Sequence, residues 1–131
     1  MYQSITLLGN LGSDPSMKYM PSGMAVTNFS MATSESWTTD GERQERTTWW
    51  RVAVYGKSAE AANQYLKKGS KVLVIGRMNA TPEGNPRVWT DNSDNARASF
   101  ELNADTVKFL SPKSDGGGRP NSDDDESEIP F

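Results

Sequence analysis

The stretch TTWWRVAVYGK, residues 47–57, restricts the fold of this chain more than any other. It carries the strongest strand pattern in the sequence, and side chains alternate between the two faces of a strand. The apolar face suits a core and carries Thr48, Trp50, Val52 and Val54. The opposite face carries Trp49, Arg51, Ala53 and Tyr55. Because a core needs neither those aromatic rings nor the arginine, this second face is a candidate for function.

Most of the remaining chain also has strand patterns, and only one segment has a helical pattern. Further strands are predicted at residues 5–9, 18–20, 25–33, 71–78, 87–90, 98–102 and 106–110, with a turn at 38–41 and a hairpin loop at 91–95. A helix is predicted over residues 58–68, capped by Ser58, stopped by Gly69 and apolar at Ala62, Tyr65 and Leu66. We therefore expect an all-β, five-stranded Greek-key barrel of the oligonucleotide-binding type, with a helix between strands three and four.

The composition changes after Leu110. The remaining segment, SPKSDGGGRPNSDDDESEIPF, has too few apolar side chains to form a core, so disorder is expected. Residues 1–110 carry 12 basic and 11 acidic side chains and have a net charge of +1, whereas residues 111–131 carry 2 and 6 and have a net charge of −4. We predict a domain over residues 1–110, a flexible linker over 111–122 and an acidic tip over 123–131.

The residue types argue against catalysis. The chain has no cysteine and no histidine, which excludes thiolate metal ligands and the commonest general base. No nucleotide-binding or nucleophile motif is present. We expect no catalytic residue, metal or cofactor. With no signal peptide pattern and no apolar run near the ~20 residues of a membrane span, a cytosolic protein is expected.

Two more tryptophans stand among polar residues, Trp37 in SESWTTDGE and Trp89 in PRVWTD. Like Trp49 and Tyr55, they have basic residues nearby in sequence, namely Arg51, Lys57, Lys71, Arg77 and Arg87. Single-stranded nucleic acid needs this combination, because bases stack on aromatic rings at about 1–3 kcal/mol each while Lys and Arg follow the phosphates. The alternative is that the rings pack under loops or at a subunit contact, and that lysines form a solvated face.

Several motifs resemble those of the bacterial-type single-stranded DNA-binding protein family. They are GNLGSDPSMKYMPSG (9–23), FSMATSESW (29–37), W-x-R-V-x-x-x-G-K (49–57), YLKKGSKVLVIGR (65–77) and the terminal IPF. The resemblance covers residues 5–110 and the tip. It implies a barrel, usually a homotetramer, that protects single-stranded DNA during replication, recombination and repair. It also implies a cytoplasmic, nucleoid-associated protein, or a phage protein in a bacterial host, with no membrane partner.

The resemblance also implies roles for individual residues. DNA bases would stack on Trp37, Trp49, Tyr55 and Trp89. Basic contacts would come from Arg51, Lys57, Lys67, Lys68 and Arg87, to which the charge pattern adds Lys71 and Arg77. Partner proteins would bind the tip residues Asp123, Asp124, Asp125, Glu126, Glu128, Ile129, Pro130 and Phe131. On composition alone, that tip is a solubilising tail.

Three features depart from the family pattern. Trp50 stands where a histidine is common and, on the inward face, would affect packing or a subunit contact. Residues 79–86 add length before Trp89, which leaves the register of Arg87 and Trp89 open. The linker over residues 111–122 is short and limits the reach of the tip.

Two other functions remain as alternatives. A barrel that binds RNA, or that serves as an accessory module of a primosome, need not carry the acidic tip. A structural or catalytic role is the third hypothesis, and the missing histidine and cysteine argue against catalysis.

Overall fold

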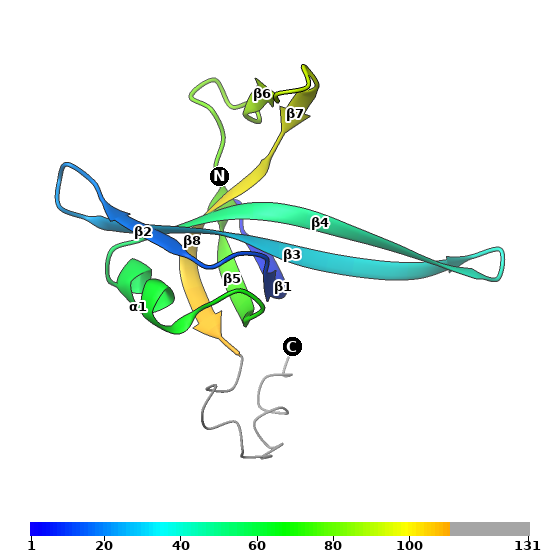
Figure 1. Ribbon diagram of the computed structural model, residues 1–131, viewed down its shortest axis with the longest axis horizontal. Helices are drawn as coiled ribbons and strands as arrows, with labels where there is room; N and C mark the ends of the chain where they lie inside the picture. Colours follow the sequence, from blue (N-terminus) through cyan, green and yellow to red (C-terminus); the bar gives the residue numbers. More distant parts are fainter. Residues whose placement is uncertain (111–131) are drawn as a thin grey trace, which may run out of the picture.

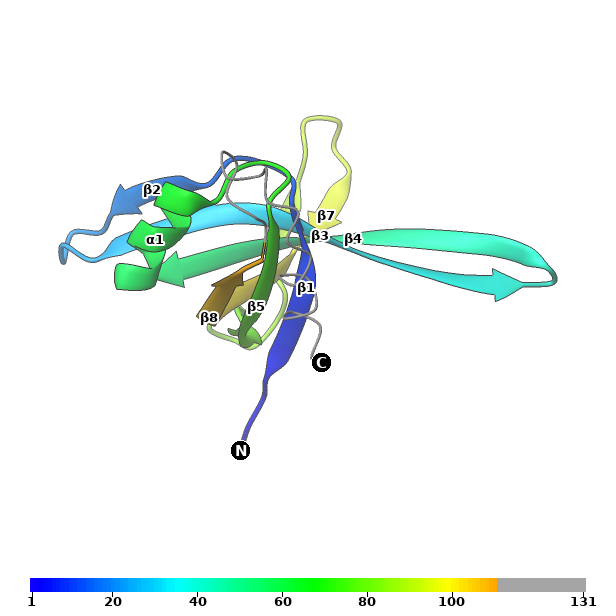
Figure 2. The same ribbon diagram turned by 90° about the horizontal axis from the view of Figure 1, so that it is seen from below.

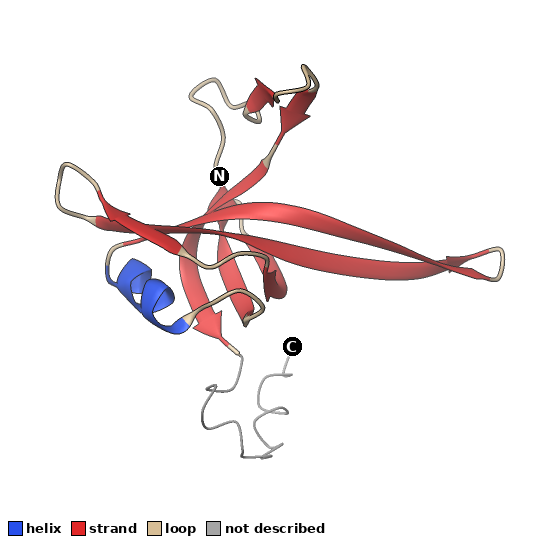
Figure 3. Ribbon diagram, in the orientation of Figure 1, coloured by secondary structure: helices blue, strands red, loops and turns tan. Residues whose placement is uncertain are grey.

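The computed structural model describes residues 1–110; the predicted linker and tip, residues 111–131, lie outside the described residues. In chain order the elements are β1 (Ile5–Leu11), β2 (Ser16–Tyr19), β3 (Ala25–Thr39), β4 (Glu42–Tyr55), α1 (Lys57–Tyr65), β5 (Lys71–Met78), β6 (Val88–Thr90), β7 (Ala96–Ala98) and β8 (Phe100–Phe109). Within residues 1–110, strands dominate and α1 is the one helix (Figure 3). No helix in this part of the chain is long and apolar enough to span a membrane.

Five strands close into a barrel (Figure 1). Their order around the ring is β1-β5-β8-β4-β3, and β3 meets β1 again at the pairs Asn10–Ala32 and Leu11–Met31. β2 pairs with β3 beside this closure. Every neighbouring pair in the ring is antiparallel except β4 and β8, which run parallel. The predicted all-β fold with a closed five-stranded barrel is confirmed.

Alternate strand positions fill the barrel with apolar side chains. On β3, Phe29 and Met31 are buried while Asn28 is exposed, so the predicted alternation of this strand is confirmed. The largest apolar side chains that are almost fully buried are Met31, Leu102, Val52, Val54, Val72 and Val74. Each apolar side chain of this size contributes roughly 1.5–3 kcal/mol by leaving water. The core therefore fixes which face of each strand points outward.

The β3–β4 hairpin extends far beyond the strand ends that the sequence predicted. Its two strands stay paired up to Thr39 and Glu42, and the chain reverses at Asp40 and Gly41, whose φ values are 52° and 80°. Positive φ at both central residues gives the tight hairpin turn that matches strand twist. Trp37 consequently lies within β3, beyond the predicted strand end at residue 33. Figure 1 shows this ribbon projecting away from the barrel.

Helix α1 packs against the barrel through Ala59 and Ala62, which are fully buried. The hydroxyl of Thr27, inside the barrel wall, donates to the Ala59 carbonyl oxygen at 2.6 Å. The N-cap residue is Gly56, and no side chain caps the helix, so the predicted capping role of Ser58 is wrong. Figure 2 shows that α1 and β2 lie at the end of the body opposite to the tip of the β3–β4 hairpin.

The C-terminal end of α1 also differs from the prediction. The helix ends at Tyr65, before the predicted stop at Gly69, because Leu66 adopts an extended backbone and its side chain packs into the core. Lys67 and Lys68 lie in the loop that follows, rather than in the last helical turn.

The hairpin after β5 has a different second arm from the one predicted. β6 pairs with β7, Val88 opposite Ala98 and Trp89 opposite Arg97. The sequence pattern placed this arm at residues 98–102, but Phe100 already belongs to β8 and pairs with β4. The reason is burial: β7 is exposed throughout, whereas β8 carries inward side chains into the core.

Candidate nucleic-acid interface

Trp49, Arg51 and Tyr55 point outward from β4. Trp49 is 55% exposed and Tyr55 41%, while the apolar side chains between them face the core. The predicted division of this strand into an apolar inner face and an aromatic outer face is confirmed. The neighbouring side chains on β3 are small, with Ala32 opposite Trp49 and Ser30 opposite Arg51. The small neighbour of Trp49 leaves its ring accessible for stacking.

The ring of Trp49 lies against Gly12, just after the end of β1. A β-carbon at Gly12 would collide with the Cζ3 and Cη2 atoms of the indole, so only glycine leaves room for the ring there. The amide of Gly12 donates to the carbonyl oxygen of Ser30 at 2.9 Å, which holds this loop against β3. The indole is thus supported by backbone on one side and remains exposed elsewhere.

A groove of about 750 Å³ borders this outer face. Its walls come from the loop after β1, from strands β3, β4 and β8, and from the loop between β5 and β6. Arg51 and Arg87, which are far apart in the sequence, both line it. The other charged residues in its lining are Asp14 and Glu101. The fold therefore brings two of the predicted basic residues to one concave surface.

Glu101 contacts Arg87 and lies opposite Arg51, and it was not among the site residues predicted from the sequence. It is opposite Arg51 in the parallel register of β4 and β8, and its Oε2 accepts a hydrogen bond from Nε of Arg87 at 3.1 Å. Nδ2 of Asn79 donates to the other oxygen, Oε1, at 3.4 Å. The only signal in the sequence was its outward position beside the core residue Leu102. Its partners depend on the pairing of distant strands.

Trp37 is not brought to this groove. In the hairpin register Trp37 is opposite Gln44 and Glu35 is opposite Arg46, so these side chains share the ribbon face of Trp50, not that of Trp49. The guanidinium carbon of Arg46 lies 5.4 Å from the centre of the Trp37 ring, within the range of a cation–π contact. Trp37 is still 43% exposed. It therefore offers a separate stacking surface on the projecting hairpin.

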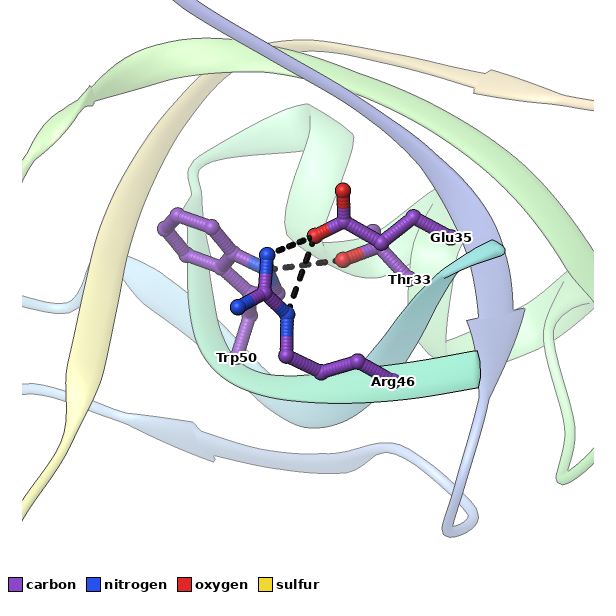
Figure 4. Close-up of polar contacts among 4 residues, drawn as sticks. All are labelled: Thr33, Glu35, Arg46 and Trp50. Atoms are coloured by element: carbon purple, nitrogen blue, oxygen red, sulfur yellow. Dashed lines mark hydrogen bonds and ion pairs between the residues drawn. The ribbon is translucent and has the colours of Figure 1, made fainter. Parts of the chain in front are cut away.

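The face of the ribbon that carries Trp37 is organised by polar contacts (Figure 4). Arg46 donates to Oε2 of Glu35 through Nε at 3.1 Å and through a terminal nitrogen at 2.6 Å. Nearer the barrel, Nε1 of Trp50 donates to Oγ1 of Thr33 at 3.2 Å. The Trp50 ring also packs against Phe100, with the ring centres 5.3 Å apart. Trp50 is thus held on the inward face, as its position in the alternation predicts.

Trp89 occupies a third location, the small β6–β7 hairpin, which projects from a different side of the barrel than the β3–β4 ribbon (Figure 1). Trp89 is 41% exposed and lies opposite Arg97. Asp91 closes the turn by accepting hydrogen bonds from the amides of Ser93 and Asn95, at 2.8 and 2.9 Å. Together the four predicted stacking residues are exposed but lie on three separate surfaces.

The remaining predicted basic residues are exposed and spread over the body. Lys57 begins α1, Lys67 and Lys68 follow it, and Lys71 begins β5. Arg77 forms an ion pair with Asp105 at 3.5 Å and lines a different pocket, formed with residues 1–4. Residues 1–110 contain no cluster of three or more side chains suited to holding a metal ion.

The fold and this surface define a class of protein. A closed five-stranded barrel with exposed aromatic side chains on its outer face, beside a groove lined by arginines, is the arrangement of oligonucleotide-binding-fold proteins that hold single-stranded nucleic acid. The model of the single-strand binding protein family matches residues 2–110, and the chain belongs to this family. The resemblance seen in the motifs of residues 5–110 is thereby confirmed, and membership implies binding of single-stranded DNA.

Proposed function

We propose that this protein binds single-stranded DNA with little sequence preference, protects it during replication, recombination and repair, and catalyses no reaction. The observation that carries this proposal is the outward row of Trp49, Arg51 and Tyr55 beside the groove that Arg87 also lines. Every base has a flat face that can stack, so such a surface does not select for sequence. The arginines supply charge for the phosphates.

The three aromatic surfaces support a curved path for the DNA. Trp49 and Tyr55 lie on the barrel, whereas Trp37 and Trp89 lie on hairpins that project in different directions (Figure 1). A strand that stacks on all of them has to change direction around the body. We infer that bound DNA wraps the protein rather than crossing one flat face, with Lys57, Lys67, Lys68 and Lys71 providing further contacts to phosphates.

A homotetramer is part of the proposal. Strand β1 pairs with β5 along its length, but in the described part of the chain its other edge meets β3 only at Asn10 and Leu11. An unpaired strand edge can pair with the same strand of a second copy. Leu8, on the outward face of β1, is 43% exposed and would lie near such a contact. Light scattering with and without oligo-dT measures the assembly.

The acidic tip is proposed as a docking site for replication, recombination and repair proteins. Its residues, 123–131, lie outside the described part of the chain, so the proposal rests on the sequence and the family resemblance. An apolar end with a terminal carboxylate suits a basic pocket, and the acidic residues steer the approach. Deleting Ile129 to Phe131 should abolish partner recruitment and leave DNA binding intact; collapse of DNA binding would overturn this division of roles.

The DNA-binding proposal is tested by titrating the protein with poly-dT while following tryptophan fluorescence. Trp37, Trp49 and Trp89 are exposed, so stacking on them should quench the fluorescence strongly, and the affinity should fall as salt rises. Unquenched fluorescence together with no mobility shift of a long oligo-dT would refute the proposal. A matched RNA oligomer separates the alternative, since a clear preference for RNA would favour an RNA-binding or primosome accessory role.

A further inference from the structure

Glu101 places a fixed carboxylate inside the groove where phosphates are proposed to bind. Its side chain is only 13% exposed, and each of its oxygens accepts a hydrogen bond, one from Asn79 and one from Arg87. The backbone amide of Asn79 also donates to the Glu101 carbonyl oxygen at 2.8 Å. A carboxylate held at both oxygens and at its backbone stays in the groove when DNA enters.

This carboxylate changes the electrostatics of the groove. The charged residues of the lining are Arg51, Arg87, Asp14 and Glu101, so their formal charges cancel. Asp14 is exposed and already accepts a hydrogen bond from the amide of Lys68 at 2.8 Å. Glu101 contacts Arg87 and is largely shielded from solvent. Its negative charge is therefore less screened by water and salt than the charge of an exposed carboxylate such as Asp14.

The two arginines are therefore unequal. Within residues 1–110, Arg51 forms no ion pair, whereas Arg87 donates Nε to Glu101 at 3.1 Å. The Arg87 side chain is 56% exposed, so a phosphate oxygen can still reach its guanidinium. That phosphate, however, would meet an arginine whose charge Glu101 already balances, and the negative charge of Glu101 would lie beside it.

We propose that Glu101 weakens the hold of this groove on phosphate and so sets the affinity for single-stranded DNA. This inference rests on the proposed function and concerns its regulation at the same groove. Glu101 keeps Arg87 in place through Nε while its charge opposes the bound phosphate. Weaker holding at one site shortens the residence of DNA, since affinity differences between related complexes arise mostly in dissociation.

The test is Glu101→Gln, which keeps the shape of the side chain and removes its charge. The carbonyl oxygen of the introduced amide can still accept from Arg87, and Asn79 can rotate its own amide to restore the second contact. Titration with oligo-dT at a series of NaCl concentrations should show roughly three- to tenfold tighter binding at low salt. The slope of log affinity against log salt should steepen by up to about 0.7, because Arg87 then neutralises a phosphate and displaces a counterion from the DNA, and the gain should shrink as salt rises.

Two further variants separate the explanations. Glu60→Gln removes one exposed carboxylate from α1, changes the net charge equally, and should alter the affinity less than about twofold. Glu101→Ala should also bind more tightly than the parent if charge is the cause. If Glu101 only positions Arg87, Glu101→Ala will bind more weakly and Glu101→Gln will match the parent, which would overturn the proposal.

Comparing oligo-dT with oligo-dC separates an effect of charge from recognition of a base. Tighter binding of Glu101→Gln to both oligo-dT and oligo-dC supports the charge effect. A loss confined to oligo-dC would assign Glu101 to recognition of the cytosine amino group and overturn it. If the parent protein binds neither oligomer, the proposed function is refuted. If the parent binds and Glu101→Gln has the same affinity as the parent, only this inference is refuted. Circular dichroism checks that each variant is folded.

Discussion

The indole ring of Trp49 lies against Gly12, so that a residue of β4 and the glycine after β1 share one contact on the outer face of the barrel. The backbone of Gly12 does not have a positive φ, so alanine fits its conformation and only the space for the ring is lost. Gly12→Ala should displace the ring and weaken oligo-dT binding about fivefold, a fraction of the ~1–3 kcal/mol of one stacked base. Fluorescence titration measures this loss.

The control for Gly12→Ala is the same change in a Trp49→Ala background. Without the indole, alanine at position 12 has nothing to displace, so the second change should add almost nothing to the loss caused by the first. Full additivity of the two losses would show that Gly12 acts on DNA binding by another route.

Arg51 should matter more for binding than Arg77. Arg51 lines the groove beside the exposed Trp49, whereas Arg77 is paired with Asp105 and lines a different pocket. Arg51→Ala should reduce the salt slope by about 0.7 and weaken binding at low salt, as expected for one lost phosphate contact to a single strand. Arg77→Ala should stay within about twofold of the parent. Equal losses in the two variants would place the DNA path across both surfaces.

Thr27 joins the barrel to α1 through a buried hydroxyl. Thr27 is fully buried and donates to the Ala59 carbonyl oxygen at 2.6 Å. Thr27→Val keeps the shape but removes that hydrogen bond, which should cost about 1–2 kcal/mol in the free energy of unfolding. Urea denaturation at fixed protein concentration measures it. Thr47→Val, which removes an exposed hydroxyl contact with Ser34, should cost no more than about 0.5 kcal/mol.

Asp91 should make the β6–β7 hairpin sensitive to acid. The hydrogen bond from Arg97, at 2.8 Å, and those from the turn amides hold the pKa of Asp91 below its ordinary value of 3.8. A lowered pKa in the folded state means that the carboxylate stabilises the hairpin above pH 3.8 and that this contribution is lost as the pH falls through the lower, folded value. Amide spectra recorded by NMR between neutral pH and about pH 2 should show the turn loosening.

A change of Asp91 to Asn should abolish that acid transition, because no carboxylate remains to protonate. Asp94→Asn, in the same turn, should preserve it. An acid transition that survives in the Asp91→Asn variant would have to come from another group.

Strand positions could be predicted wherever the local pattern was strong. β5 begins and ends at the predicted residues, and the two faces of β4 were identified from alternation alone. Two of the errors fell where burial of one side chain decides the boundary. Leu66 ends α1 by packing into the core, and Phe100 leaves the small hairpin because β8 enters the barrel. Neither the burial of Leu66 nor the entry of β8 into the barrel can be predicted from local secondary-structure propensity.

The candidate site shows the same division. The sequence context of Trp37, Trp49, Tyr55 and Trp89 favoured their exposure, but it did not predict their distribution over separate surfaces. That Trp37 lies on the ribbon face opposite to Trp49 depends on the register set by the turn at Asp40. A shift of one residue in that register would move every side chain of one strand to the other face.

By itself the sequence determined the barrel class, the family and the outward row of Trp49, Arg51 and Tyr55, because side-chain alternation and local motifs are properties of neighbouring residues. The tertiary structure alone decided that Arg51, Glu101 and Arg87 meet in one groove. Their meeting requires parallel pairing of β4 with β8 and the return of the loop after β5. Burial of the shared core drives that pairing, since it removes apolar side chains of both strands from water at once.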